Sequence, residues 1–212
     1  MVFISRFLGI DEMITYTYVW YIISILHFPN RALFSSLYHH MNISIAMNNA
    51  EGDHLTGEYV QMAIVLNVVS SIPASIIAVA IVPPIMTWIG YGGKVVSSCY
   101  YYSMIACVSN MMDNTLSMIS IAMDIGGHAR FNAIFDFWET VLTIVVTAFV
   151  IPLFQPSLFS LGVVYLVQDI LMTLIYYGVT CQSFGWFDRY WKGFFSKFDY
   201  TLVSKLSLLT IE

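Results

Sequence analysis

Two carboxylates three residues apart, Asp136 and Glu139, are the side chains in this sequence best suited to chemistry. At this spacing both lie on one helical face, together with Asn132 and Thr143. Two ionised carboxylates in an apolar setting repel each other, so we expect the pair to hold a proton or a cation. The alternative is that both acids lie near the membrane surface, fully hydrated, because the surrounding helix starts only at about His128.

Asp169, Asp113 and Asn114 complete the set of candidate ion- or substrate-binding residues. Asp169 interrupts a stretch, 140–187, that otherwise contains no Asp, Glu, Lys or Arg. Asp113 and Asn114 belong to a stripe of polar residues at three- and four-residue steps, which also contains Asn110, Ser117 and Asp124. Such polar faces indicate a hydrated interior shared by several helices, because a carboxylate at mid-membrane costs roughly 2.5–3.5 kcal/mol unless it faces protein or water. The alternative is that these residues only join helices through hydrogen bonds.

Other reactive residue types do not form recognisable sites. The three cysteines, Cys99, Cys107 and Cys181, form no CxxC motif, and residues 51–54 (EGDH) are a single ExxH spacing without matching ligands elsewhere. We therefore predict no catalytic residues, no metal ligands and no cofactor, apart from a coupling ion, H⁺ or Na⁺. The chain is not expected to be an enzyme.

The composition places these candidates in a membrane. Of 212 residues, 58% are hydrophobic and only 10% are charged, and the mean hydropathy is +0.76. Soluble domains carry about 25% charged residues, so this chain cannot cover a globule with a water-compatible surface. A soluble enzyme and a disordered chain are excluded, and a net charge of −5 disfavours a nucleic-acid partner. The composition predicts an integral, multi-pass membrane protein; it does not specify the membrane.

Turn-forming and polar clusters divide the chain into about five complete spans plus partial ends, in an all-α polytopic bundle. The predicted spans are 12–47, 58–88, 94–123, 128–151 and 157–182, each long enough for a bilayer core of about 30 Å. The first is expected to be one helix bent near Pro29. Residues 185–212 are expected to form a cytoplasmic connector and the start of a further span.

Five short sequence marks occur between about residue 3 and residue 195: FLGIDEM (7–13), SIAM (44–47) with EGD (51–53), EYVQ (58–61), GHAR (127–130) and WKGF (191–194). In the same order, they resemble marks of the multidrug and toxic compound extrusion (MATE) transporters. These are the family's LG-x-E-L, its S-Q-A-x-G-A-G loop, the start of its third helix, its G-x-x-R/K turn and its W-x-G-F connector. The chain departs from the family at Ile45 and Asn48, where Gln and Gly are usual, and at Phe131, where Pro is usual.

This resemblance implies a secondary active antiporter of two six-helix lobes, which exports organic cations, drugs or metabolites against H⁺ or Na⁺. Residues 1–195 would be most of the N-terminal lobe, and its partners would be a small organic substrate, the bilayer and a missing C-terminal lobe. No ion-binding residue transfers by motif, so the candidates above rest on their own chemistry. Two alternatives stay open: a lipid-linked oligosaccharide flippase, which would have a basic cavity, and a non-transporting membrane scaffold, which would need no buried acids.

The positive-inside bias predicts that residues 185–199 are cytoplasmic, because loops then inside contain Arg130, Arg189, Lys192, Lys197 and Lys205, whereas those outside contain only Arg6 and Lys94. In a background without the native cysteines, Tyr91→Cys and Ser183→Cys should therefore be labelled by an impermeant thiol reagent from opposite sides of the membrane. Labelling of both from one side would contradict the five-crossing topology.

Overall fold

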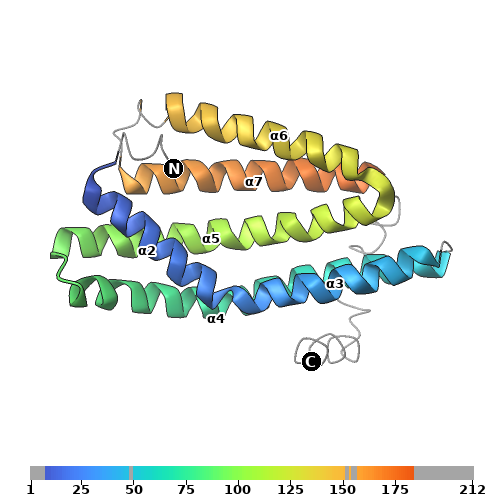
Figure 1. Cartoon of the computed structure of the whole chain (residues 1–212), viewed down its shortest axis with the longest axis horizontal. Coiled ribbons are helices and arrows are strands. Elements are labelled where there is room, and N and C mark those ends of the chain that lie inside the picture. Colours follow the sequence, from blue (N-terminus) through green and yellow to red (C-terminus); the bar gives the residue numbers. More distant parts are fainter. Residues whose placement is uncertain (1–7, 48–49, 151–152, 154–156, 184–212) are drawn as a thin grey trace. The chain divides into compact units, whose positions relative to one another are not determined.

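The computed structural model describes residues 8–47, 50–150, 153 and 157–183, and the longer regular elements of this part are all helices (Figure 1). They are α2 (Ile10–Leu26), α3 (Phe28–Ala46), α4 (Ala50–Trp88), α5 (Gly93–Met123), α6 (Ala129–Val145) and α7 (Leu158–Ser183). Two π-helical turns, η1 (Asp124–His128) and η2 (Val146–Val150), follow α5 and α6. The all-α class is confirmed. The predicted connector at 185–212 lies outside the described residues.

In the part of the chain that the structure describes, three helices are long and apolar enough to cross a membrane. These candidate spans are Thr56–Trp88, Ala129–Phe149 and Leu158–Thr180, with mean hydropathies of 2.3, 1.3 and 2.0. Prolines at 73, 83 and 84 do not interrupt α4, as is common in membrane helices, where neighbouring groups compensate for the lost backbone hydrogen bonds.

The first predicted span is divided into two helices at His27. The backbone N–H of His27 still donates to the Ile23 carbonyl at 2.9 Å, but its φ of −92° and ψ of 5° leave the helical range. Pro29 is the second residue of α3, where a proline is tolerated because a first-turn N–H has no partner within the helix. The break between the two helices thus lies two residues before Pro29, near which a bend in a single helix was predicted.

Glycine forms the junction between α5 and α6. Gly127 has a φ of +84°, a left-handed conformation that glycine adopts without steric cost. The Asn132 side-chain amide then donates to the Ser120 carbonyl at 2.8 Å and to the Asp124 carboxylate. Asn132, predicted on the polar face of the fourth span, therefore ties the two sides of this junction together.

The chain forms two compact units, which divide the long helices between them. Of the described residues, unit 1 contains those in 8–27, 71–112 and 136–172, and unit 2 contains those in 28–70, 113–135 and 173–183. In unit 2, polar contacts join α3 to α4 (Ser44 to Thr56 hydroxyl, 2.7 Å) and α4 to α5 (Asn67 amide to Thr115 hydroxyl, 3.1 Å). The rings of Phe135 on α6 and Tyr176 on α7 meet edge-to-face at 4.4 Å.

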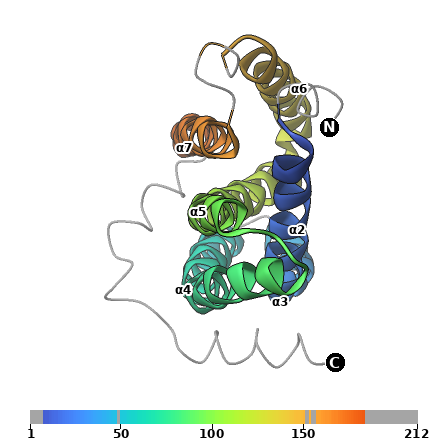
Figure 2. The same ribbon diagram turned by 90° about the vertical axis from the view of Figure 1, so that its left-hand side faces the viewer.

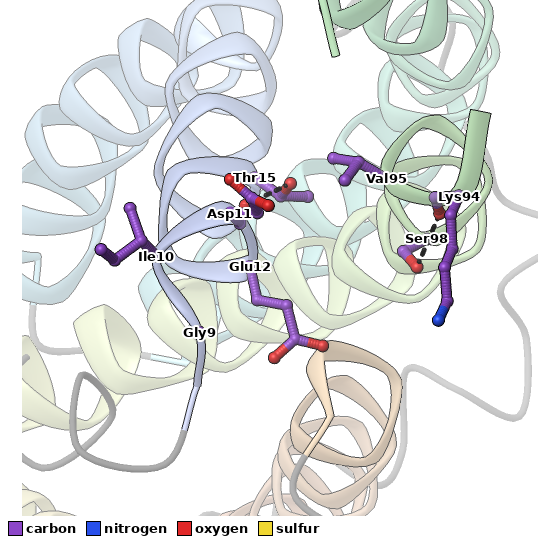
Figure 3. A pocket seen from close by; sticks show the side chains of 8 residues that line it. All are labelled: Gly9, Ile10, Asp11, Glu12, Thr15, Lys94, Val95 and Ser98. Atoms are coloured by element: carbon purple, nitrogen blue, oxygen red, sulfur yellow. Dashed lines mark hydrogen bonds between the residues drawn. The ribbon is translucent and has the colours of Figure 1, made fainter. Parts of the chain in front are cut away.

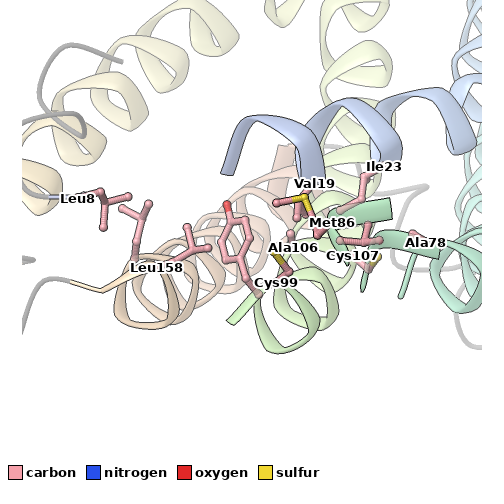
Figure 4. Packing of buried hydrophobic residues seen from close by; sticks show 12 residues of the cluster. Leu8, Val19, Ile23, Ala78, Met86, Cys99, Ala106, Cys107 and Leu158 are labelled. Carbon is pink, nitrogen blue, oxygen red and sulfur yellow. The ribbon is translucent and has the colours of Figure 1, made fainter. Parts of the chain in front are cut away.

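Unit 1 has an apolar core contributed mainly by α2, α4, α5 and α7 (Figure 4). Both views show the first part of α5 between the last part of α4 and the first part of α7 (Figures 1 and 2). Tyr102 of α5 is 1% exposed, and its hydroxyl accepts a hydrogen bond of 2.9 Å from the Trp20 indole. Gly162 of α7 lies against this ring, so that a Cβ there would be 3.0 Å from a Tyr102 ring carbon.

The close approach of α7 to Tyr102 gives a stability prediction. Gly162→Val should lower the free energy of unfolding by about 1–3 kcal/mol, because the added atoms overpack the Tyr102 and Ile105 side chains. Gly178→Val is the matched control on the same helix, since a Cβ at Gly178 meets nothing within 4 Å. Thermal unfolding in detergent measures both, and equal midpoints would contradict the tight contact.

Candidate functional site

The structure divides the five candidate residues between the two units. Unit 1 contains Asp136 and Glu139 on α6 and Asp169 on α7, whereas unit 2 contains Asp113 and Asn114 on α5. Asp113 and Asp136 are exposed, Glu139 and Asp169 are half-buried, and Asn114 is buried. Within unit 1, the side chain of Asp169 has a partner on another helix.

Asp169 accepts a hydrogen bond from the Ser109 hydroxyl of α5. Ser109 is 6% exposed, so the contact links α5 to α7 in a largely apolar setting. Ser157 and Ser160 cap the start of α7 with two reciprocal hydrogen bonds. The Ser157 hydroxyl accepts from the Ser160 backbone N–H at 3.2 Å, and the Ser160 hydroxyl accepts from the Ser157 backbone N–H at 3.1 Å. Asp169 lies three turns into the candidate span Leu158–Thr180, where an acidic side chain requires such a partner.

The neighbouring residue, Gln168, links α7 to α6. Its amide nitrogen donates to the Thr143 hydroxyl at 2.5 Å, and Thr143 in turn donates to the backbone carbonyl of Glu139 at 2.9 Å. Glu139 and Thr143, which were predicted on one face of the fourth span, are therefore connected, through the Glu139 backbone. Gln168 and Asp169 are adjacent on α7, but their hydrogen bonds join different helices. Gln168 bonds to α6, whereas Asp169 bonds to α5.

One turn earlier, Tyr165 makes a third polar contact from α7. Its hydroxyl lies 2.9 Å from the hydroxyl of Thr147, which belongs to the π-helical turn η2. Turns of this kind are frequent at functional sites because the extra residue re-aims nearby side chains. Tyr165, Gln168 and Asp169, with their partners Ser109, Thr143 and Thr147, are called the α7 polar cluster below.

One residue of this cluster and one residue next to it in the sequence each have a buried polar atom without a hydrogen-bond partner within the described part of the chain. These atoms are the Gln168 side-chain oxygen, an acceptor, and the Asn110 side-chain nitrogen, a donor next to Ser109. Both residues are more than nine-tenths buried. Unsatisfied buried groups are rare in folded proteins and indicate a place for a water or an ion.

The chemistry of the α7 polar cluster is that of oxygen ligands. The cluster contains one carboxylate, four hydroxyl-bearing side chains and an amide oxygen, and each of these groups is of a type that can bind a proton or a hard cation such as Na⁺. Among the residues that the structure describes, no group of three or more His, Cys, Asp or Glu side chains could bind a metal ion.

A hollow of unit 1, of about 540 Å³, lies at the start of α2 and α5 (Figure 3). Asp11, Glu12 and Lys94 line it, and the Glu12 carboxylate is directed toward the first turn of α7. One of its oxygens lies 3.4 Å from the backbone nitrogen of Leu158. A carboxylate at a helix N-terminus stabilises the unpaired N–H groups there, which gives Glu12 a structural role.

Sequence reasoning missed Ser109, Tyr165 and Gln168 as parts of the cluster. Tyr165 precedes Asp169 by four residues and therefore shares its helical face, a signal present in the sequence. Ser109 carries no such signal, because its pairing with a residue 60 positions away depends on how α5 packs against α7.

No protein-family model matches this sequence, and no curated protein and no solved structure is significantly similar to it.

A double-mutant cycle tests the contact that defines the cluster. Ser109→Ala and Asp169→Ala should show a coupling energy of about 0.6–1.7 kcal/mol, the range for polar pairs between membrane helices. Ser98→Ala is the control on α5, because the Ser98 hydroxyl donates to the Lys94 carbonyl of its own helix. Unfolding by denaturant in mixed micelles measures the cycle, and a Ser109 coupling no larger than that of Ser98 would contradict the pairing.

Proposed function

We propose that this chain is part of an ion-coupled membrane transporter, with Asp169 as the residue that binds the coupling ion. The observation that carries the proposal is an acidic side chain inside a candidate membrane span, with a hydroxyl partner on α5, beside polar contacts to α6. Ionisable residues at such positions are rare in membrane helices and commonly belong to ion or proton pathways.

Coupling requires a group whose occupancy biases one of two conformations. Ionisation of Asp169 would strengthen the acceptor side of its hydrogen bond with Ser109, whereas protonation or cation binding would weaken it. The packing of α5 against α7 would then respond to the ion. The neighbouring Gln168–Thr143 and Tyr165–Thr147 contacts would keep α6 attached to α7 in both states.

The finer assignment follows the sequence marks that resemble the MATE family. In this proposal the chain forms most of an N-terminal lobe, with about five crossings, and a second lobe completes the substrate pathway. The exported substrates are organic cations, drugs or metabolites. The exposed acids Asp113 of unit 2 and Asp136 of unit 1 suit such substrates, because each acid by itself could attract a cation. The flippase alternative requires basic groups in place of these acids.

A second candidate is a membrane scaffold without transport activity. It is favoured by the polar contacts in both units, such as Ser44 with Thr56 and Asn67 with Thr115, which are sufficient to join helices. In a scaffold, Asp169 would serve only as a hydrogen-bond acceptor for Ser109. The two candidate functions differ in whether the negative charge of Asp169 is required for activity.

The substitution Asp169→Asn separates the two functions, because asparagine can still accept the Ser109 hydrogen bond but cannot ionise. We expect Asp169→Asn to leave the unfolding midpoint almost unchanged. In the purified chain, infrared difference spectra between low and high pH, or without and with Na⁺, should lose one carboxyl band. In the complete two-lobed transporter, ion-driven export of a fluorescent organic cation should be abolished.

Asp11→Asn is the control, since Asp11 is an exposed acid in the first turn of α2. It should retain the ion-linked band and export. The double variant Asp136→Asn with Glu139→Gln tests the other acid pair: loss of export there, with full export by Asp169→Asn, would move the ion site to α6. Unchanged spectra in all three variants would support the scaffold.

A further inference from the structure

His27, at the end of α2, is a buried titratable side chain that the proposed function does not use. Its side chain is 3% exposed, and it is the residue at which the backbone leaves the helical range. Its Nδ1 lies 3.4 Å from the Ser71 hydroxyl of α4, and its Nε2 has no hydrogen-bond partner among the described residues. The imidazole therefore has a partner for only one of its two nitrogens.

The neighbours of His27 on the buried faces of α2 and α4 are apolar. Val19, Ile23 and His27 follow one another at four-residue steps and therefore share one face of α2. Val19 and Ile23 are fully buried, in the same apolar cluster of unit 1 as Ala78 and Val82 of α4 (Figure 4). The His27–Ser71 pair thus ends an otherwise apolar contact between α2 and α4.

In the described part of unit 1, no carboxylate forms an ion pair with His27. The acids of α2, Asp11 and Glu12, are at the opposite end of that helix, about 22 Å away at ~1.5 Å per residue. The charged residue that follows His27 in the sequence is Arg31, and a positive charge does not favour an imidazolium. In the parts of α4 and α5 that belong to unit 1, residues 71–112, the titratable and charged side chains are Tyr91, Lys94, Cys99, Tyr100, Tyr101, Tyr102 and Cys107.

The surroundings of His27 suit the neutral imidazole and oppose the charged one. The Ser71 hydroxyl can accept a hydrogen bond from Nδ1–H, and Nε2 is then the unprotonated nitrogen of the neutral ring. A proton added to Nε2 would create a donor without an acceptor and a buried charge without a counter-charge. Such a charge costs several kcal/mol. The imidazolium is therefore stable only where water reaches it.

The end of α2 is a place where water can reach a buried side chain without disruption of a long helix. The backbone at His27 is already outside the helical range, and Pro29, two residues later, has no N–H to donate. Phe28, the next residue, is 66% exposed. Separation of this end of α2 from α4 would break the Ser71 contact and few backbone hydrogen bonds, which is the condition for local opening.

We propose that His27 is a proton-sensitive latch between the end of α2 and α4. The neutral imidazole is buried against Ser71 and keeps the latch closed. A proton taken up from water at Nε2 opens it, and the end of α2 moves away from α4 so that the imidazolium becomes hydrated. The latch belongs to the packing of unit 1 and does not depend on the proposed transport function.

Hydrogen–deuterium exchange of the purified full chain in mild detergent tests the latch. The exchange of the amides of residues 20–28, corrected for the intrinsic effect of pH, should rise about tenfold between pH 7.5 and pH 5.5. The open imidazole takes up a proton below about pH 6.5, the ordinary pKa of histidine, whereas the closed imidazole does not, so opening increases about tenfold per pH unit. The amides of residues 170–180 in α7 are the internal reference and should not respond.

His27→Gln removes the titratable group and should make the exchange of residues 20–28 independent of pH. His39→Gln is the matched control, because His39 is an exposed histidine of α3, and it should keep the wild-type response. Circular dichroism checks folding, and His27→Leu replaces His27→Gln if that variant is not folded. Asp169→Asn should also keep the response, whichever function the chain has.

Three results would overturn the proposal. One is wild-type exchange at residues 20–28 that does not change with pH. Another is a pH response that persists without His27. The third is an equal rise in α7, which would mean that acid destabilises the whole chain and not the end of α2.

Discussion

A polar group inside a bilayer must find its partner within the protein, because no water is available in the hydrocarbon layer. In both units, polar side chains are paired between helices as this requirement demands. In unit 1 the side chains of α7 bond to hydroxyl groups of α5 and α6, and in unit 2 Asn67 and Ser44 bond to hydroxyl groups of neighbouring helices. Apolar surface alone cannot select these pairings, since lipid tails are as apolar as the side chains they would replace.

Helix α7 combines close packing with polar contacts. Near its start, Gly162 allows the Tyr102 ring to lie directly against the helix backbone. Farther along, Tyr165, Gln168 and Asp169 make hydrogen bonds to two different helices within little more than one turn. The close contact at Gly162 helps to position the polar side chains farther along α7, because a helix is stiff over this distance.

The α7 polar cluster and the groove between α4 and α5 differ in how their polar groups are paired. In the cluster, the buried side-chain oxygen of Gln168 has no hydrogen-bond partner among the described residues. Along the groove, which residues 71–80 of α4 and 100–111 of α5 line, the Ser71 and Cys107 side chains already have partners inside unit 1. Because buried polar atoms are usually paired, the unpaired oxygen of Gln168 indicates a place for a water or an ion in the cluster.

The sequence by itself determined the class of the protein and the approximate positions of its helices. The evidence for the helices was the long uncharged stretches, and the evidence for their ends and bends was Pro29 and the pair Gly126 and Gly127. Such signals can be found in the sequence because composition, a missing backbone donor and a positive φ act within a few residues. It also indicated Asp169, since one acid in a long uncharged stretch is visible without any structure. Only the tertiary structure decided that Ser109 of α5 is a side-chain partner of Asp169, and that Tyr102 is buried while Tyr100 is exposed. Those outcomes depend on which face of each helix meets another helix, and helical periodicity describes the faces without specifying the neighbour.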